Sequence, residues 1–264
     1  MGAGAVSQLE DHQQQGGRGR NVSLGAGDYA SADRVDPRPI LIVTGLVQEA
    51  RIAAGPGMAV ICSSSDPRQL RALLTVFDPT TIRGVVSFGV AGGLDPSLKS
   101  GDVVVATEVM AGDTRWLAGL SLSEEQIAGI ALGRRRVVRG GLAGVDEIVL
   151  AQACKAALRS VTGAAAVDME SHIAAAYAAE HDLPFAALRV ISDPATRALP
   201  ALARAAIKPN GDIDLRKVLR GLARNPKALR ALVSTGIDFN RALKSLRGCR
   251  SFLLGGEGLV AANF

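Results

Sequence analysis

Short apolar runs alternate with longer amphipathic stretches between about residues 39 and 195. The runs are strand-sized, are rich in Val and Ile, and in several cases are apolar on both faces of a strand. They occupy residues 39–46, 58–62, 84–88, 101–107, 164–167 and 184–193. Strands that alternate with helices and are buried on both faces are typical of a layered α/β fold. We therefore predict an α/β domain built around a largely parallel or mixed sheet.

Local signals mark several boundaries of the predicted elements. Asp66 followed by Pro67 indicates the start of a helix, because proline is tolerated at the first helical position. Gly163 lies near the end of another predicted helix. The glycine-rich residues 89–93 separate two predicted strands, so we expect a turn there.

Beyond the last predicted strand the pattern changes to basic amphipathic helices. Asn225 and Pro226 predict the N-cap and first residue of one of them. The apolar positions with helical spacing are Leu215, Val218, Leu219, Leu222, Leu229, Leu232, Val233, Leu243 and Leu246. We therefore divide the chain into a flexible tail (residues 1–36), an α/β core (37–195) and a basic helical segment (196–264) packed on the same domain.

Positive charge is concentrated in residues 201–250. This stretch has twelve Lys and Arg against three Asp, a net charge of +9, so the rest of the chain carries −4 of the total of +5. The simplest interpretation is a solvated basic face on helices that pack against the sheet. The alternative is contact with an acidic membrane surface or an apolar ligand. We do not expect nucleic-acid binding, because aromatic residues are not interleaved with the basic ones.

Composition excludes several classes of protein. The chain has 264 residues, of which 48% are hydrophobic, enough to bury a substantial core. No apolar run reaches the roughly 18 residues of a membrane span, and the N-terminus lacks the layout of a signal peptide. Three widely spaced cysteines indicate neither a disulfide framework nor a zinc site. We expect a cytoplasmic protein without a metal or another cofactor.

Polar or glycine-rich groups follow four of the predicted strands. They are Glu49, the glycine stretch 89–93, residues 168–170 and residues 192–193. In open α/β sheets, ligands bind beyond the carboxyl ends of the strands. Each group alone is equally well explained by a helix cap or a turn. Four such groups in one chain, however, indicate a binding site.

The sequences GVAGGLDPSLKSGDVVVAT, AVDMES and LRVISD, in this order, resemble the purine nucleoside phosphorylase and adenosyl-nucleoside nucleosidase superfamily. The resemblance covers about residues 39–195. It implies a three-layer α/β/α fold with a mixed central sheet, cleavage of an N-glycosidic bond and a homo-oligomer, for which we expect a homodimer. VTGLVQEARIA, AVDMESHIAA and the basic tail more narrowly resemble the hopanoid-associated phosphorylase branch. That resemblance implies removal of adenine from adenosylhopane.

Cleavage of a ribose–purine bond builds positive charge on the sugar and negative charge on the leaving base. A buried acid near purine N7 must therefore hold and donate a proton. The resemblance implies that Asp193 is this acid and that Ser192 orients it. It also implies that Glu170 faces the ribose hydroxyls and that Met169 packs on the ribose. Asp168 is the weaker candidate, and we expect it to cap the helix that follows.

The attacking group is ambiguous in this sequence. Glu49 resembles the glutamate that positions water in the nucleosidases. Phosphorylases of the superfamily carry an arginine near this position, whereas this chain has Arg51 two residues later, and Ser87 where another arginine is common. The backbone around Gly45 and Gly89 is a further candidate for holding an anion. Hydrolysis and phosphorolysis both stay open, with phosphate as co-substrate in the second case.

Recognition of the purine is the least defined part of the predicted site. Ile148 stands where relatives often have an aromatic ring that stacks on the base, so Phe88 and Trp116 become candidates for that contact. The resemblance also assigns three residues of the glycine stretch to the substrate pocket: Val90, Ala91 and Gly92.

Two other functions are compatible with the sequence. One is a methylthioadenosine/S-adenosylhomocysteine nucleosidase, which would need a small, closed pocket for the 5′ group. The other is a non-catalytic nucleoside- or lipid-binding protein, which is less favoured because binding alone needs no proton donor such as Asp193. His172 follows Glu170 by two residues and so projects from another helix face, which favours a structural role.

Overall fold

The computed structural model describes residues 36–119, 128–129, 135–200 and 229–254. Residues 1–35 of the predicted N-terminal tail therefore lie outside the described residues, as do residues 201–228 of the basic segment, which include the predicted cap at Asn225. All described residues belong to one structural unit, Asp36–Phe264.

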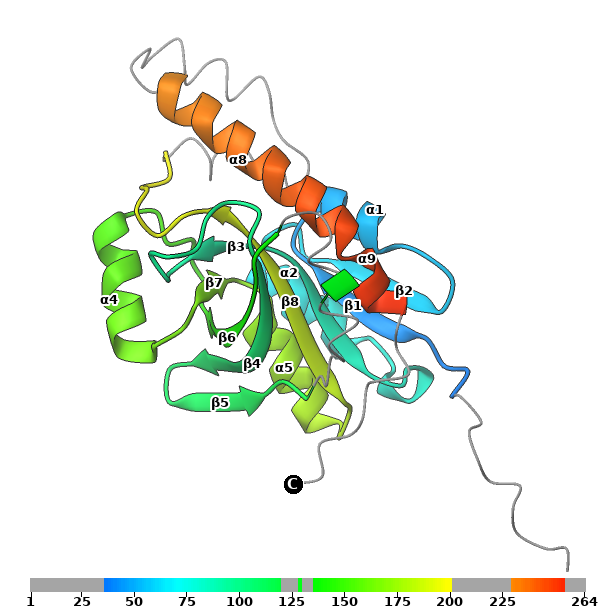
Figure 1. Ribbon diagram of the computed structural model, residues 1–264. Helices are drawn as coiled ribbons and strands as arrows, with labels where there is room; N and C mark the ends of the chain where they lie inside the picture. The colour runs from blue at the N-terminus through cyan, green and yellow to red at the C-terminus, as the bar shows by residue number, and fades with distance from the viewer. Residues whose placement is uncertain (1–35, 120–127, 130–134, 201–228, 255–264) are drawn as a thin grey trace, which may run out of the picture. The chain divides into compact units, whose positions relative to one another are not determined.

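The described strands form one mixed, eight-stranded sheet (Figure 1). They are β1 (Ile40–Thr44), β2 (Met58–Cys62), β3 (Val85–Gly93), β4 (Val103–Ala111), β5 (Thr114–Leu117), β6 (Val137–Gly144), β7 (Ala166–Asp168) and β8 (Phe185–Asp193). β1 is parallel to β2 and β3, β3 is parallel to β8, and β6 is parallel to β4 and β7. β7 runs antiparallel to β3, and β5 and β8 run antiparallel to β4. The predicted α/β fold with a mixed sheet is confirmed.

Strand β8 closes part of this sheet into a ring. It pairs with β3 on one side and β4 on the other, while β7 and β6 connect β3 to β4 by a second route. The register places Gly92 of β3 beside Val167 of β7 and Asp193 of β8. It also places Gly144 of β6 beside Asp168 of β7. Two carboxylates are thereby brought to one edge of the sheet.

Helices cover both faces of the sheet (Figure 1). They are α1 (Val47–Ala53), α2 (Pro67–Thr75), the 3-10 helix η1 (Pro79–Thr81), α4 (Gln152–Thr162), α5 (Ser171–Glu180), α8 (Leu229–Gly248) and α9 (Arg250–Leu254). Buried side chains of α2 and α5 belong to the apolar cluster on one face, and those of α1, α8 and α9 to the cluster on the other. This is the three-layer arrangement expected from the sequence.

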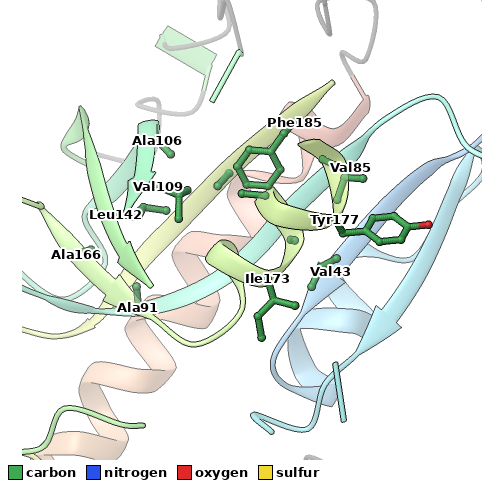
Figure 2. Packing of buried hydrophobic residues seen from close by; sticks show 14 of the residues in the cluster. Val43, Val85, Ala91, Ala106, Val109, Leu142, Ala166, Ile173, Tyr177 and Phe185 are labelled. Carbon is green, nitrogen blue, oxygen red and sulfur yellow. The ribbon is translucent and has the colours of Figure 1, made fainter. Parts of the chain in front are cut away.

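Figure 2 shows the packing around α5. Val43 of β1 and Phe185 of β8 belong to the same buried cluster as Ile173 and Tyr177 of α5. The Tyr177 hydroxyl donates a hydrogen bond to the carbonyl of Phe77 at 3.1 Å, so the ring is buried while its polar end has a partner. Most other residues of α5 are alanines, which let the helix lie close to the sheet and fix its N-terminus at the strand edge.

Two helix boundaries predicted from the sequence are confirmed. Asp66 caps α2, because its Oδ1 accepts the backbone N–H of Arg68 at 2.9 Å and that of Gln69 at 3.4 Å. Gly163 ends α4 with φ of 71°, a left-handed conformation that favours glycine.

The glycine-rich stretch is the end of strand β3, which runs to Gly93. The prediction of a turn there is therefore wrong. A Cβ added at Gly89 would lie 2.7 Å from Glu49 Oε1 and 2.6 Å from Arg189 Nη1. A Cβ at Gly92 would lie 3.3 Å from an Asp193 oxygen. Glycine is needed because buried side chains approach the strand closely.

Helix α8 buries its C-terminal half more completely than its N-terminal half. Leu243 and Leu246 are buried in the core. Leu229 and Val233, predicted to share an apolar face with Leu232, are 47% and 52% exposed. The three positions share one side of α8, as their spacing predicts, but Leu232 alone of the three lines the cavity. None of the described helices is long and apolar enough to cross a membrane.

Candidate active site

A cavity of about 350 Å³ lies at the ends of β1, β3, β7 and β8, within the range of roughly 300–1,000 Å³ found for small-molecule sites. The residues that line it are Gly45, Leu46, Glu49, Ser65, Val90, Ala91, Gly92, Val145, Ile148, Val149, Val167, Asp168, Met169, Glu170, Ser192, Asp193, Leu199, Leu232, Thr235, Gly236 and Phe239. Carboxylates gather at the strand ends, and most of the other lining residues are apolar.

Glu49 is held at the start of α1 by backbone donors. Its Oε2 accepts the N–H groups of Gly45 and Leu46, both at 2.8 Å, and its Oε1 accepts that of Val90 at 2.7 Å. The bond from Leu46 is one half of a capping box, so Glu49 also has a structural role. Burial raises the pKa of Glu49, although the positive charge of Arg189 and the three N–H donors oppose the rise.

Glu170 shares one buried cation with other carboxylates. Arg189 Nη2 lies 3.5 Å from Glu170 Oε2, and Arg189 Nε lies 2.9 Å from Asp168 Oδ2. The Ser63 hydroxyl donates to Glu170 Oε1 at 3.3 Å. Burial raises the pKa of Glu170 to about 7; Arg189 opposes the rise, and the negative charges of Asp168 and Glu49 add to it. Glu170 therefore gains and loses its proton near neutral pH.

Asp168 caps helix α5, as the sequence suggested. Its Oδ1 accepts the N–H groups of Glu170 at 3.0 Å and Ser171 at 2.7 Å, and its Oδ2 accepts the Ser171 hydroxyl at 2.6 Å. Because Asp168 also pairs with Arg189, its oxygens are occupied by protein donors. The geometry thus favours Glu170 over Asp168 as the residue free to contact a ligand.

Asp193, the last residue of β8, has a partner for each carboxylate oxygen. The Ser192 hydroxyl lies 2.7 Å from Oδ1, and the ammonium group of Lys155 on α4 donates to Oδ2. Lys155 is completely buried and also donates to the carbonyls of Pro194 at 3.2 Å and Arg197 at 3.1 Å. The position of Asp193 is therefore fixed from two elements, its own strand and α4.

Much of the remaining cavity lining is apolar. Its residues come from the loop after β6, from the segment after β8 and from α8; they are Val145, Ile148, Val149, Leu199, Leu232 and Phe239. Phe239 also packs against the core cluster on the α8 face of the sheet. The cavity thus offers carboxylates for hydrogen bonding together with a large hydrophobic surface.

A profile of the phosphorylase superfamily matches residues 34–220 of the sequence, more than half of the chain. The chain belongs to the phosphorylase superfamily. This confirms the superfamily indicated by the glycine-rich, Met-Glu and Ser-Asp motifs, and with it an enzyme of the nucleoside phosphorylase and nucleosidase class. The narrower hopanoid-associated branch stays a prediction. No curated protein sequence matches the chain significantly.

Solved structures of nucleosidases share the fold of this superfamily member. The 5′-methylthioadenosine/S-adenosylhomocysteine nucleosidase from Neisseria meningitidis, in complex with methylthio-immucillin-A, has 16% identity and a TM-score of 0.56 over 83% of this chain and 99% of that chain. The Helicobacter pylori nucleosidase with butyl-thio-DADMe-Immucillin-A has 20% identity and a TM-score of 0.53 over 83% and 97%. Futalosine hydrolase of Helicobacter pylori has 18% identity and a TM-score of 0.52 over 83% and 96%. At these identities the likeness establishes the fold alone.

Most of the site residues predicted from the superfamily motifs meet in the cavity: Gly45, Glu49, Val90, Ala91, Gly92, Ile148, Met169, Glu170, Ser192 and Asp193. They come from five separate stretches of sequence. Met169 is half-buried in the wall beside Glu170, where an apolar side chain can pack on a ligand.

Four predicted site residues do not line this cavity: Arg51, Ser87, Phe88 and Gly89. Ser87 and Phe88 are completely buried in β3, with Phe88 in the core and Ser87 accepting a bond from Arg189 at 2.6 Å. Arg51 lines a separate surface hollow with Arg247, because two residues along α1 it points away from Glu49. Trp116, the other candidate for purine stacking, packs against the core cluster next to α5.

Sequence patterns did not predict several residues of this region, among them Lys155, Arg189 and Phe239. Arg189 had a visible signal, since an arginine inside an apolar strand must find buried counter-charges. In the sequence, Lys155 is not distinguishable from a surface lysine of an amphipathic helix, and Phe239 is not distinguishable from a core residue of a different helix. Their roles depend on which elements meet in space, which no local pattern reveals.

Within the residues that the structure describes, no group of three or more His, Cys, Asp or Glu residues is arranged to hold a metal ion.

His172 contacts a loop beside the cavity. Its Nε2 lies 3.0 Å from Asp146 Oδ1, which also accepts a hydrogen bond from Arg71 at 2.8 Å. These contacts connect α5 to the loop that carries Ile148, which gives His172 a structural role.

Proposed function

We propose that the protein hydrolyses the N-glycosidic bond of a 5′-substituted adenosine and releases adenine. The observation that carries this proposal is the convergence of Asp193, Glu49 and Glu170 on one cavity whose lining is otherwise largely apolar. Family membership supports the reaction class. The complexes of structural neighbours with methylthio- and butyl-thio-immucillin compounds support a 5′-substituted nucleoside as the ligand type.

Each carboxylate has a distinct role in the proposed reaction. Asp193 donates a proton to N7 of the leaving purine, and Ser192 keeps its Oδ1 oriented. Glu170 accepts hydrogen bonds from the ribose hydroxyls and stabilises the positive charge that develops on the sugar, while Met169 packs on the ribose. Glu49 orients the water molecule that attacks C1′.

The charge distribution supports water over phosphate as the nucleophile. A phosphate dianion on the attacking side would face Glu49 and Glu170. The buried cation nearby, Arg189, is already paired with Asp168 and Glu170. Arg51, which was considered as a phosphate ligand, lines another hollow. When these carboxylates are ionised, like-charge repulsion disfavours phosphate at this point.

We further propose that the 5′ substituent is large and apolar, with adenosylhopane as the substrate. The hydrophobic wall supports a hydrocarbon next to the ribose, since Leu199, Leu232 and Phe239 offer no hydrogen bond to a polar substituent. The resemblance of residues around Glu49 and Glu170 to the hopanoid-associated branch supports the identity of that hydrocarbon.

We also propose that α8 contacts a membrane surface, where such a lipid would be found. Leu229, Val233 and Ile237 form an exposed apolar stripe along this helix. Asp238 is the single acidic residue of α8, and Arg197 and Arg241 pair with it. An apolar stripe on a basic helix is complementary to an anionic bilayer.

A substrate comparison tests the proposed function. Adenine release is measured by chromatography after incubation with adenosylhopane or methylthioadenosine, each with and without phosphate. We expect faster release from adenosylhopane, free ribose-type product and no effect of phosphate. A sugar phosphate as product would contradict hydrolysis, and preference for methylthioadenosine would contradict the hopanoid assignment. No release from either nucleoside would reject the enzyme, and Asp193→Asn serves as the inactive control.

A further inference from the structure

Lys155 is a completely buried cation that the reaction described above does not use. An ammonium group has three protons, and three oxygens surround this one: Asp193 Oδ2 and the carbonyls of Pro194 at 3.2 Å and Arg197 at 3.1 Å. Each proton therefore has an acceptor, as a buried charged group requires. The arrangement fits the charged form of the lysine.

Ser192 supplies a second constraint on Asp193. Its hydroxyl oxygen lies 2.7 Å from Asp193 Oδ1 and 3.1 Å from the carbonyl of Ala91. A hydroxyl has one proton, so it donates to only one of these oxygens at a time. When it donates to Ala91, it offers a lone pair to Asp193, and that contact needs a proton on Oδ1. Ser192 can thus accommodate both the protonated and the ionised acid.

We propose that Lys155 is a positioning residue for the acid Asp193, an inference that rests on the proposed function. By occupying Oδ2, Lys155 confines the transferable proton to Oδ1, on the side of Ser192. By remaining charged, it stabilises the carboxylate that forms as the proton leaves. The interaction between the Lys155 ammonium group and the Asp193 carboxyl group is stronger in the transition state than before proton transfer, and this difference accelerates the reaction.

The C1′–N9 bond breaks and its electron pair stays on the purine, while the Oδ1–H bond of Asp193 breaks and an N7–H bond forms. Lys155 keeps its three protons throughout. The water oxygen bonds to C1′, and its released proton passes to Glu49 and then to solvent. Asp193 is reprotonated from solvent after the purine leaves.

A purely structural role for Lys155 predicts different kinetics. Its bonds to Pro194 and Arg197 hold the segment that leads to Leu199 in the cavity wall. If holding that segment were its whole role, losing Lys155 would weaken substrate binding and raise KM. If it acts through Asp193, the loss lowers kcat, because the effect belongs to proton transfer.

The test compares wild type, Lys155→Met, Asp193→Asn and the double variant, with the nucleoside that wild type cleaves faster. We expect Lys155→Met to lower kcat by about a hundredfold or more, the scale of general acid catalysis, with little change in KM. In the Asp193→Asn background the same substitution should have no further effect on single-turnover release with enzyme in excess. Arg159→Met is the matched control, since it removes an ion pair with Asp95, which does not involve Asp193, one turn further along the same helix.

Several outcomes would overturn the inference. They are an unchanged kcat, a rise in KM alone, or an equal loss in the Asp193→Asn background. If Lys155→Met fails to fold, the double variant, which leaves neither charge unpaired, is compared with Asp193→Asn, and a lower rate in the double variant contradicts the proposal. Wild type that releases adenine from neither nucleoside rejects the proposed function itself, whereas active wild type with an equally active Lys155→Met rejects the role of Lys155 alone.

Discussion

Arg189 Nε lies 2.9 Å from Asp168 Oδ2, and the exposed fractions of the two side chains are 0% and 1%. The same guanidinium lies 3.5 Å from Glu170 Oε2, and its charge also acts on Glu49. One buried cation thus serves several carboxylates that line the cavity. Removing a single partner from such a group leaves uncompensated charge inside the protein.

We expect Arg189→Met to lower the free energy of unfolding by about 3–5 kcal/mol at pH 7.5. Urea denaturation followed by circular dichroism measures this change. Arg71→Met is the matched control, because it breaks the ion pair between Arg71 and Asp146, whose side chains are 47% and 59% exposed. It should lower the free energy of unfolding by no more than about 1 kcal/mol. Similar losses in both variants would contradict the buried network.

The raised pKa of Glu170 predicts a pH-dependent stability. Its pKa rises from the ordinary 4.5 to about 7, so between these values the folded state binds more protons than the unfolded state. The resulting contribution of Glu170 to the free energy of unfolding is fully present below about pH 4.5 and is lost as the pH rises through 7. At about 1.4 kcal/mol per pH unit, it amounts to at most roughly 3 kcal/mol.

Urea denaturation of wild type and Glu170→Gln across pH 5 to 8 measures that dependence. The variant should lose less stability than wild type as the pH rises, since its amide does not titrate. Some dependence of the same sign should remain, because burial raises the pKa of Glu49 as well. Parallel stability profiles for the two proteins would show that Glu170 titrates normally.

Gly45→Ala should displace Glu170. The added Cβ would lie 2.7 Å from Glu170 Oε1, closer than packed atoms tolerate. We expect kcat/KM for the nucleoside substrate to fall at least about tenfold, equivalent to about 1.4 kcal/mol, with a smaller loss of stability. The control is Gly129→Ala, where a Cβ meets no atom within 4 Å. Unchanged kcat/KM in Gly45→Ala would contradict a role of Glu170 in catalysis.

The exposed stripe of α8 predicts lipid binding. The Val233→Glu/Ile237→Glu variant should reduce co-sedimentation with anionic phospholipid vesicles about tenfold or more, since burying one such side chain stabilises by about 1.5–3 kcal/mol. Hydrolysis of soluble methylthioadenosine should be unaffected. Val161→Glu, at a position of α4 that is 84% exposed, is the control for added charge. Equal sedimentation of all three proteins would contradict membrane contact.

Much of this arrangement could be predicted from the sequence. A parallel strand pattern places polar residues at strand ends on one edge of the sheet, so Glu49, Glu170 and Asp193 were expected to meet. Helix signals such as Asp66 and Gly163 are local and were interpreted correctly. The superfamily motifs then gave these residues their expected chemistry.

Other features were not predictable because they depend on distant elements. The glycine stretch suggested a turn, whereas β3 continues through it, and the lack of a side chain at Gly89 lets Glu49 and Arg189 approach the strand closely. The pairing of Lys155 with Asp193 depends on how α4 packs near the end of β8, which has no signal in either segment. Phe239 became part of the cavity wall because α8 crosses this edge, while the sequence drew attention to Phe88 and Trp116.

The ring of strands closed by β8 has a further consequence. Asp168 and Asp193 are the last residues of strands in this ring and Glu170 follows β7 closely, whereas α8 reaches the cavity from outside the sheet. In the proposed reaction, proton transfer belongs to the strand ends and recognition of the 5′ group belongs to α8. Exchange of Leu232 or Phe239 would then change the hydrophobic lining while Asp193 and Glu170 keep their places in other elements, so substitutions in a single helix would be enough to admit new nucleoside substrates.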